Sequence, residues 1–182
     1  MAHGGAKGSE SKLQDKYQKF TQIEHVLKRP GMYIGSVESK DDQVWVWDDD
    51  LERMVFQEIN FNPGLIKLFD EIIVNALDEA GKDTSLNKIQ VTISPGNGRI
   101  VIENNGVGID VALHPQHKVY IPELIFGNLL TSTNYDDSQQ RFSAGTHGLG
   151  AKLTAIFSTY FQVEVGDKKR KKTFFQVYEK NL

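Results

Sequence analysis

The segment Leu65–Ala80 constrains the fold of this 182-residue chain more than any other part of the sequence. With about 100° of rotation per residue, its apolar side chains share one broad face of a helix, and Glu71, Asn75 and Asp78 follow one another along the opposite face. Such a helix gains most of its stability by packing its apolar face against another layer. The segment therefore predicts a helix that lies on a sheet.

Other segments predict the strands of that sheet. Ile89–Ile93 alternates apolar and polar side chains, the turn Ser94–Gly98 reverses the chain, and Arg99–Glu103 follows as the partner strand. Phe161–Val165 and Thr173–Tyr178 predict a second hairpin. Further strands are expected at Val44–Trp47 and Met54–Ile59, and further helices at Tyr17–Lys28, Ile121–Leu130 and Ala151–Ser158. This order predicts the α+β class, with helices layered on one face of a mixed β-sheet.

Composition limits the classes of protein that remain. Hydrophobic residues make up 39% and charged residues 25%, with a net charge of −3, which allows a core and argues against nucleic-acid binding through overall charge. The chain has no cysteine, so disulfides and thiolate metal sites are excluded. No apolar run approaches the roughly 18 residues of a membrane span. Residues 1–16 are polar and predict a disordered tail. Because cysteines and a membrane-spanning run are both absent from the sequence, residues 17–182 are expected to form a soluble, intracellular domain.

Glu71 and Asn75 lie one turn apart on the polar face of the predicted helix. A carboxylate can take a proton from water, and a carboxamide oxygen can bind a hard cation such as magnesium. The helix on its own favours a plainer interpretation, in which both side chains belong to the solvated face of an amphipathic helix.

A second polar feature follows the strand Arg99–Glu103. Asn104 is followed by Gly106 and Gly108, so a short polar side chain lies beside backbone that a ligand can approach closely. An adenine ring needs such a group at its amino edge. The pattern alone favours an ordinary turn after a strand.

Glycines also precede the predicted helix Ala151–Ser158. Successive backbone N–H groups in such a loop can curve around an anion, and the start of a helix favours negative charge. The loop matches neither common phosphate-binding template. Walker A requires Gly-Lys-Ser/Thr, whereas Ala151 and Lys152 follow Gly150 here, and a Rossmann loop requires a preceding strand, whereas Asp136–Ala144 is polar. Both of those nucleotide-binding folds are therefore disfavoured.

Taken in order, these features resemble the GHKL superfamily with its Bergerat ATP-binding fold. Four segments narrow the resemblance to the N-terminal ATPase region of eukaryotic type IIA DNA topoisomerases, namely Thr21–Ser36 (TQIEHVLKRPGMYIGS), Phe69–Ala76 (FDEIIVNA), Leu129–Asp137 (LLTSTNYDD) and Gly148–Leu153 (GLGAKL). The resemblance extends over residues 17–182. Thr146 and His147 depart from the Arg-Asn that is usual in that family, so a charged contact of the loop is absent.

The resemblance implies a role for each matching residue. Glu71 would be the general base of ATP hydrolysis, Asn75 would bind magnesium, and Asn104 would read adenine. The other matches are Gly106 and Gly108 beside the adenine, the lid residues Ser132, Thr133 and Asn134, the triphosphate loop of Gly145, Thr146, His147, Gly148, Leu149, Gly150, Ala151 and Lys152, and Tyr17, which would reach the nucleotide of a partner protomer. The alternative for Tyr17 is a purely structural contact with the first helix.

The resemblance also implies cofactors and partners. ATP and magnesium would be bound, and the longer enzyme would be a nuclear homodimer, with an organellar location left open. ATP-driven dimerisation would couple to the passage of one DNA duplex through a double-strand break in another, with DNA bound by other domains. The transducer and DNA-cleavage domains would lie beyond residue 182.

Two alternatives remain at this point, which are another GHKL-fold ATPase and a nucleotide-binding module without turnover. Glu71 disfavours a third, the sensor histidine kinases, because those enzymes lack a glutamate at this position. The basic run Lys168–Lys172 favours a solvated turn, with DNA contact or a targeting signal as the alternatives.

Overall fold

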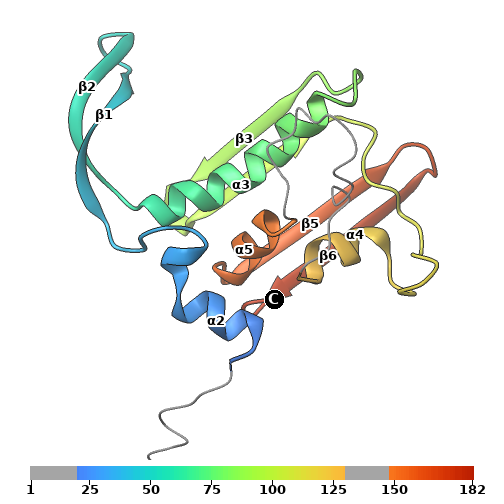
Figure 1. Cartoon of the computed structure of the whole chain (residues 1–182). Coiled ribbons are helices and arrows are strands. Elements are labelled where there is room, and N and C mark those ends of the chain that lie inside the picture. Colours follow the sequence, from blue (N-terminus) through green and yellow to red (C-terminus); the bar gives the residue numbers. More distant parts are fainter. Residues whose placement is uncertain (1–19, 130–147) are drawn as a thin grey trace, which may run out of the picture.

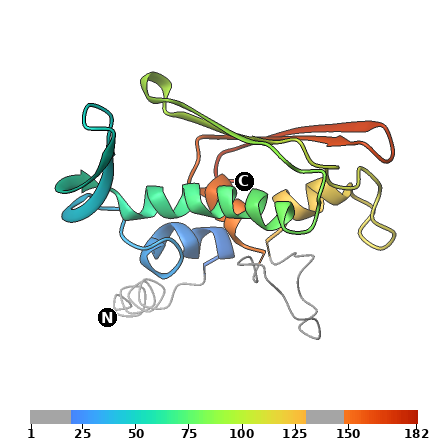
Figure 2. The ribbon, with the colours of Figure 1, turned by 90° about the horizontal axis from the view of Figure 1, so that it is seen from above.

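The computed structural model describes residues 20–129 and 148–182, and it has two layers. Two of the three strand hairpins form one layer, and helices cover one of its faces (Figures 1 and 2). The predicted α+β class is thereby confirmed. The predicted tail 1–16, Tyr17 and the predicted helix end at Leu130 lie outside the described residues.

The elements follow the predicted order. The helices are α2 (Gln22–Lys28), α3 (Pro63–Ala80), α4 (Ile121–Gly127) and α5 (Gly150–Ile156), with short 3-10 turns at Pro30–Met32 and Pro95–Asn97. The strands are β1 (Lys40–Asp48), β2 (Arg53–Phe61), β3 (Ile89–Ser94), β4 (Arg99–Asn104), β5 (Tyr160–Asp167) and β6 (Lys172–Glu179). Every predicted helix and strand within the described residues is present, with shifted ends.

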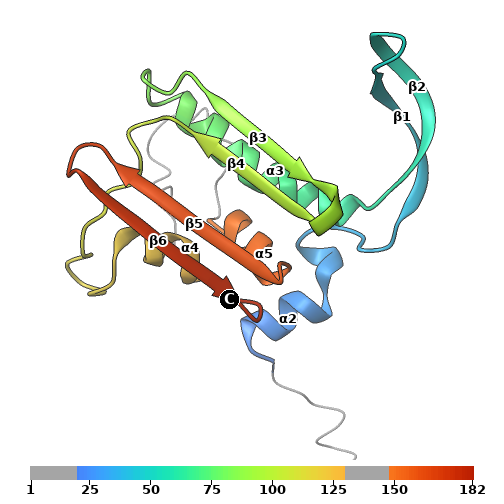
Figure 3. The ribbon, with the colours of Figure 1, turned by 180° about the vertical axis from the view of Figure 1, so that it is seen from behind.

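Strand pairing differs from the expected mixed sheet in one respect. Among the described residues, the strands pair as three antiparallel hairpins, β1 with β2, β3 with β4 and β5 with β6. Short turns close these hairpins, and a short turn can join only antiparallel neighbours. The hairpins β3–β4 and β5–β6 nevertheless lie side by side in one layer, with β4 next to β5 (Figure 3).

Contacts near the end of β4 join these two hairpins. The Lys168 N–H donates to the Val107 carbonyl at 3.1 Å, and the Val111 N–H donates to Asp167 Oδ2 at 2.8 Å. Gly108 has a φ of +83°, and a Cβ at this position would collide with the Gly166 carbonyl. Both the backbone angle and the close approach therefore require glycine at position 108.

Local signals set the ends of the helices. Asn62 caps α3 by accepting the Leu65 N–H at 2.9 Å, and Pro63 occupies the first turn, where no N–H is needed. Thr21 and Glu24 form a capping box at the start of α2. The residue before Pro30 leaves the helical region, so α2 ends where the sequence predicted.

Helix α5 lies at the centre of the first core cluster. Leu153 and Ile156 of α5 pack with Val26 of α2 and with Ile34, and Ile156 is fully buried. A second cluster, formed by Val111, Val163, Val165 and Tyr178, lies beneath the β5–β6 hairpin. The short helix that follows the glycine-rich loop is thus held by the core, which fixes the position of the loop's end.

The β1–β2 hairpin extends away from the two layers at the start of α3 (Figures 1 and 3). Its strands are longer than the sequence predicted, because the polar residues on either side of Val44–Trp47 continue the pairing. One face carries the cross-strand pairs Trp45 with Phe56 and Trp47 with Met54, all of them exposed. None of the helices in the described residues is long and apolar enough to cross a membrane.

Replacing Gly108 by alanine is expected to destabilise the fold by more than about 2 kcal/mol, because the new Cβ would collide with the Gly166 carbonyl in addition to the strain of a positive φ. Gly35→Ala is the matched control. Gly35 has nearly the same φ, +81°, but open space around its Cβ position, so only the strain of about 1 kcal/mol is expected. Urea denaturation followed by circular dichroism measures both. Equal losses would contradict the close contact between the two hairpins.

Candidate functional site

The candidate site begins with Glu71 in the middle of α3. Its carboxylate is half-buried and forms an ion pair with Lys67, one turn earlier, at 2.5 Å between Nζ and Oε1. This ion pair restricts the rotamers that the Glu71 side chain can adopt. Lys67 was not among the predicted site residues, although the i, i+4 spacing in the sequence indicates this pair.

Gly150, the first residue of α5, lies against Glu71. An added Cβ at position 150 would meet Glu71 Oε2 and would come within 2.8 Å of its Cδ and 3.0 Å of its Cβ. One turn later, Thr154 Oγ1 donates to the Leu68 carbonyl of α3 at 3.1 Å. These contacts bring the end of the glycine-rich loop to the predicted general base. Sequence reasoning missed Thr154, and no pattern in the sequence marks it.

Asn75 lies one turn beyond Glu71 on the exposed side of α3. Its Nδ2 donates to the Glu71 carbonyl at 2.7 Å, within the helix. The amide nitrogen is thereby used for structure, which leaves Oδ1 as an acceptor for a cation or a water molecule. Glu71 and Asn75 thus keep the relation that the sequence predicted, with a carboxylate and an amide oxygen on adjacent turns.

Lys152 is the most buried cation of the described residues, with 1% of its surface exposed. Its Nζ donates to the Gly148 carbonyl at 2.6 Å, so the ammonium group closes the loop onto the start of α5. Burial lowers the pKa of Lys152 from 10.5 to about 8. With a pKa of about 8, the ammonium group is still mostly charged at neutral pH. Keeping this charge buried costs solvation free energy, and a nearby anion would reduce that cost.

The described end of the loop, Gly148 to Ala151, presents mainly backbone. Gly148 has a φ of +62°, and no side chain caps the first turn of α5. Leu149 packs into the first core cluster, and Ala151 is half-buried. Because its side chains are small or turned inward, this part of the loop can bind an anion only through N–H groups and the Lys152 charge.

Asn104 ends β4, and its Oδ1 accepts the Gly106 N–H at 3.4 Å. Gly106 is buried, and a Cβ there would come within 2.9 Å of Asp83 Oδ2 and 3.1 Å of Leu86 Cδ1. Like Gly108, this glycine has a packing reason to be a glycine. Asn104, Gly106 and Gly108 are neighbours along the chain, and their contact with a ligand stays a prediction.

Asp83 shapes this region and was also missed by sequence reasoning. Its Oδ2 accepts the Val107 N–H at 2.7 Å, and its Oδ1 accepts the Ser85 N–H and hydroxyl. Hydrogen bonds from Ser85 and then from Val107, together with the charge of Lys168, hold the pKa of Asp83 below its usual value. Asp83 therefore fixes the backbone that follows Asn104.

Seven predicted site residues lie outside the described residues, and their roles stay predictions. They are Tyr17, the lid residues Ser132, Thr133 and Asn134, and the loop residues Gly145, Thr146 and His147.

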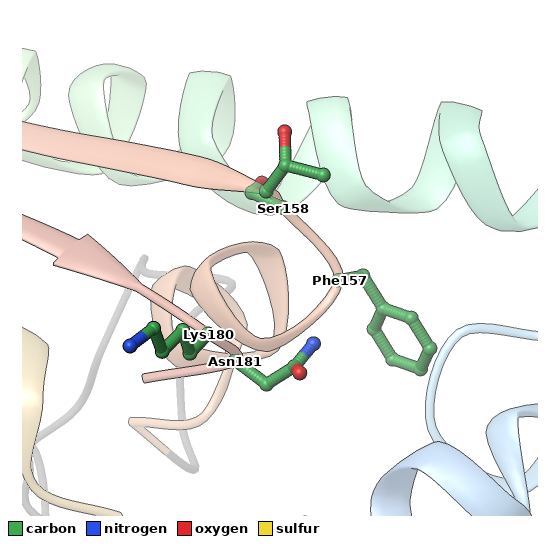
Figure 4. Close-up of a pocket in the computed structure, with 5 residues that line it drawn as sticks. Phe157, Ser158, Lys180 and Asn181 are labelled. Carbon is green, nitrogen blue, oxygen red and sulfur yellow. The ribbon is translucent and has the colours of Figure 1, made fainter.

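A shallow hollow of about 300 Å³ lies elsewhere, beside the end of α5 (Figure 4). Phe157, Ser158, Thr159, Lys180 and Asn181 line it, and none of these five is a carboxylate. It adjoins the last turn of α5, whereas Glu71 faces the first residue of that helix. The hollow therefore holds none of the predicted site residues, and we assign no nucleotide to it.

Residues 62–180 match the model of the histidine kinase-, DNA gyrase B- and HSP90-like ATPase family. The chain belongs to this family. The match includes Glu71, Asn75, Asn104 and Lys152, so the ATPase fold and the candidate site lie in the same part of the chain.

Within the family, the chain is similar to eukaryotic type II topoisomerases, which confirms the predicted resemblance. DNA topoisomerase 2 of Penicillium chrysogenum is 45% identical over 173 residues, and DNA topoisomerase 2-alpha of Sus scrofa is 51% identical over 166 residues. These alignments cover 95% and 91% of this chain but 11% of each relative. The chain thus spans about a tenth of the length of these relatives.

Solved structures agree with the sequence comparison. The ATPase region of Saccharomyces cerevisiae topoisomerase II has a TM-score of 0.89 and 45% identity, covering 92% of this chain and 44% of that chain. The ATPase and transducer domains of DNA topoisomerase II from Balamuthia mandrillaris have a TM-score of 0.90 and 45% identity, covering 92% and 43%. The chain therefore has the fold of a topoisomerase II ATPase region.

The contact between Gly150 and Glu71 predicts energetic coupling between the two positions. Gly150→Ala is expected to cost about 1–3 kcal/mol of stability, because the methyl group would displace the carboxylate. In a Glu71→Ala background the cost should fall, giving a coupling energy of at least about 0.5 kcal/mol in a double-mutant cycle.

Gly31→Ala is the control for this cycle, since nothing lies within 4 Å of a Cβ at that position. It should show no coupling with Glu71→Ala. A Gly150→Ala cost that is the same with and without the Glu71 carboxylate would contradict the contact.

The lowered pKa of Lys152 predicts a pH dependence of stability. Between pH 8 and 10.5 the unfolded chain holds a proton that the folded chain has lost, so the free energy of unfolding should rise with pH, by at most about 1.4 kcal/mol per pH unit. Burial raises the pKa of Tyr178 from 10.0 to about 12, which acts in the opposite direction above pH 10. The clear window is therefore pH 8 to 10.

Chemical denaturation of the wild type and of Lys152→Met across this window measures the effect. The variant lacks the ammonium group, so the rise relative to the wild type should disappear. If the free energy of unfolding changed with pH in the same way for both proteins, Lys152 would have no lowered pKa in the folded state.

Proposed function

We propose that this chain binds ATP with magnesium between α3 and the loop that ends at Lys152, and that it hydrolyses the ATP. The observation that carries the proposal is the contact between Gly150 and Glu71. Gly150 is the first residue of α5, where backbone N–H groups would suit a phosphate, and it lies against a carboxylate that would suit the activation of water. The family supports the same conclusion, since its members are described as ATPases.

Glu71 has the surroundings that a general base requires. Lys67 pairs with its carboxylate and Gly150 of α5 lies against it, so both neighbours restrict its rotamers. The carboxylate would orient a water molecule towards the terminal phosphate and take its proton as the water oxygen bonds to phosphorus and the bond to the leaving ADP oxygen breaks. Gly150 lets the phosphates approach without a side chain in between.

Asn75 is the residue of the described site that suits magnesium. Within the described ranges, no group of three or more acidic or histidine side chains is placed to hold a metal ion. Magnesium commonly uses one or two protein oxygens together with water and the phosphates of its nucleotide, and Asn75 Oδ1 is such an oxygen. The bound ion would neutralise phosphate charge.

Asn104 and Lys152 would hold the two ends of the nucleotide. Asn104, at the end of β4, would bind the amino edge of adenine, and Lys152 would contribute its charge to the triphosphate. Tyr17, Ser132, Thr133, Asn134 and Gly145 to His147 would complete the site as the resemblance implies.

The role of the longer protein follows the relatives, which are named as DNA topoisomerases. In this proposal ATP brings two copies together, and the closed dimer drives passage of one DNA duplex through a break in another. Nuclear localisation is part of the same proposal. The rival, a nucleotide-binding module without turnover, has no use for a restrained carboxylate beside the loop, so Glu71 favours hydrolysis.

Glu71→Gln tests the proposal. This variant keeps the shape of the side chain but removes the base, so ATP affinity should stay within a few-fold while turnover falls by about 10²- to 10⁴-fold. Glu79→Gln is the matched control, because Glu79 is an exposed carboxylate on the same helix and should be dispensable. Single-turnover phosphate release with magnesium gives the rate, and calorimetry gives the affinity.

The outcomes separate the two functions. Normal hydrolysis by Glu71→Gln would remove Glu71 from the mechanism. Tight ATP binding without phosphate release by the wild-type chain would favour the module without turnover.

A further inference from the structure

Five consecutive basic residues, Lys168–Lys172, form the turn between β5 and β6 together with the first residue of β6, and are called the basic turn below. It lies at the end of the β5–β6 hairpin, away from the chain's C-terminus (Figures 1 and 3). The proposed ATPase site makes no use of these charges. Their concentration contrasts with the chain as a whole, whose net charge is −3.

Two of the five cations anchor the turn. The guanidinium group of Arg170 forms ion pairs with Asp110 and with the buried Asp167, and Asp167 Oδ1 accepts the Arg170 N–H at 2.8 Å. The Nζ of Lys168 donates to the Asn105 carbonyl at 2.8 Å, and its charge also lies near Asp83. The negative charges of Asp110 and Asp167 are therefore neutralised by Arg170, and that of Asp83 lies near Lys168.

The other three cations, Lys169, Lys171 and Lys172, are exposed. Within residues 20–129 and 148–182, no ion pair or hydrogen bond of their ammonium groups is found. Because Arg170 and Lys168 hold the backbone, three neighbouring charges project from a fixed turn. An anion that binds them would not have to order the loop first.

We propose that the basic turn binds the phosphate backbone of double-stranded nucleic acid, without reading its bases. Duplex DNA carries one negative charge per about 1.7 Å of its axis, which matches several close cations better than the sparser charges of an acidic peptide. Lysine ammonium groups are point charges that bind phosphate without geometric selectivity. This contact goes beyond the proposed ATPase function, in which DNA is bound by other domains.

The composition of the turn itself disfavours an anionic membrane as the partner. Residues 166–172 read GDKKRKK and include no apolar side chain that could insert between lipids. Electrostatic contact with phosphates is therefore the interaction that these residues provide.

The salt dependence of binding measures the number of phosphates contacted. A fluorescently labelled duplex of about 20 base pairs is titrated with the chain between about 50 and 200 mM salt, and log K is plotted against log salt. Each phosphate contact contributes about −0.9 to the slope. The triple variant Lys169→Gln, Lys171→Gln, Lys172→Gln should therefore flatten the slope by about 2.7 and lower affinity at the lowest salt by at least about tenfold.

The control removes the same charge elsewhere, through Arg53→Gln, Arg99→Gln and Lys180→Gln, which are exposed residues outside the basic turn. It should leave the slope within about one contact of the wild type. Thermal melting checks that each variant is folded. If the triple variant does not fold, the three single lysine variants replace it, and each is expected to change the slope by about 0.9. ATP affinity, measured on the same proteins, should not change, so failure here is separate from failure of the ATPase proposal.

Two results would overturn the inference. In the first, the lysine and control triple variants reduce duplex binding equally, so that only net charge matters. In the second, vesicles of phosphatidylserine and phosphatidylcholine bind through the three lysines while the duplex does not.

Discussion

The close packing of α5 against α3 at Gly150 is the constraint on which the rest of the site depends. Any side chain at position 150 would enter the space of the Glu71 carboxylate, and the Thr154 hydroxyl binds the carbonyl of Leu68 one turn further on. Only a glycine lets the two helices meet here. As a result, the end of a phosphate-binding loop and a carboxylate lie together without intervening atoms, which suits a reaction between water and a phosphate.

The core holds this arrangement in place. Leu153 and Ile156 anchor α5 among residues of α2, and Lys152 lies between these anchors and the loop with its ammonium group on the Gly148 carbonyl. A buried lysine opposes stability while it is charged, which its lowered pKa reflects. Such a cost at a position facing a loop that suits anions is typical of a functional site, because a bound anion would offset it.

Much of the fold was predictable from local patterns. The apolar period of Leu65–Ala80 and the alternation on either side of Ser94–Gly98 gave α3 and the β3–β4 hairpin, with α3 beginning two positions earlier, at Pro63, because Asn62 provides the cap. The β1–β2 strands were predicted too short, because their polar ends lack a clear pattern. For the site, only relations between residues of the same helix or strand were predictable. Glu71 and Asn75 share one helix, whereas the contact of Glu71 with Gly150 and the link from Val111 to Asp167 join residues far apart in sequence, which no periodicity reveals.

An NMR titration of the labelled chain with magnesium and a non-hydrolysable ATP analogue tests the central claim most directly, which is that nucleotide binds where α5 meets α3. The largest changes in amide chemical shift are expected at Gly148 to Lys152, around Glu71 and Asn75, and at Asn104. Little change is expected at Phe157 and Asn181 in the hollow at the other end of α5. Changes concentrated at that hollow or along the β1–β2 hairpin, with Gly148 to Lys152 unaffected, would rule out nucleotide binding where α5 meets α3.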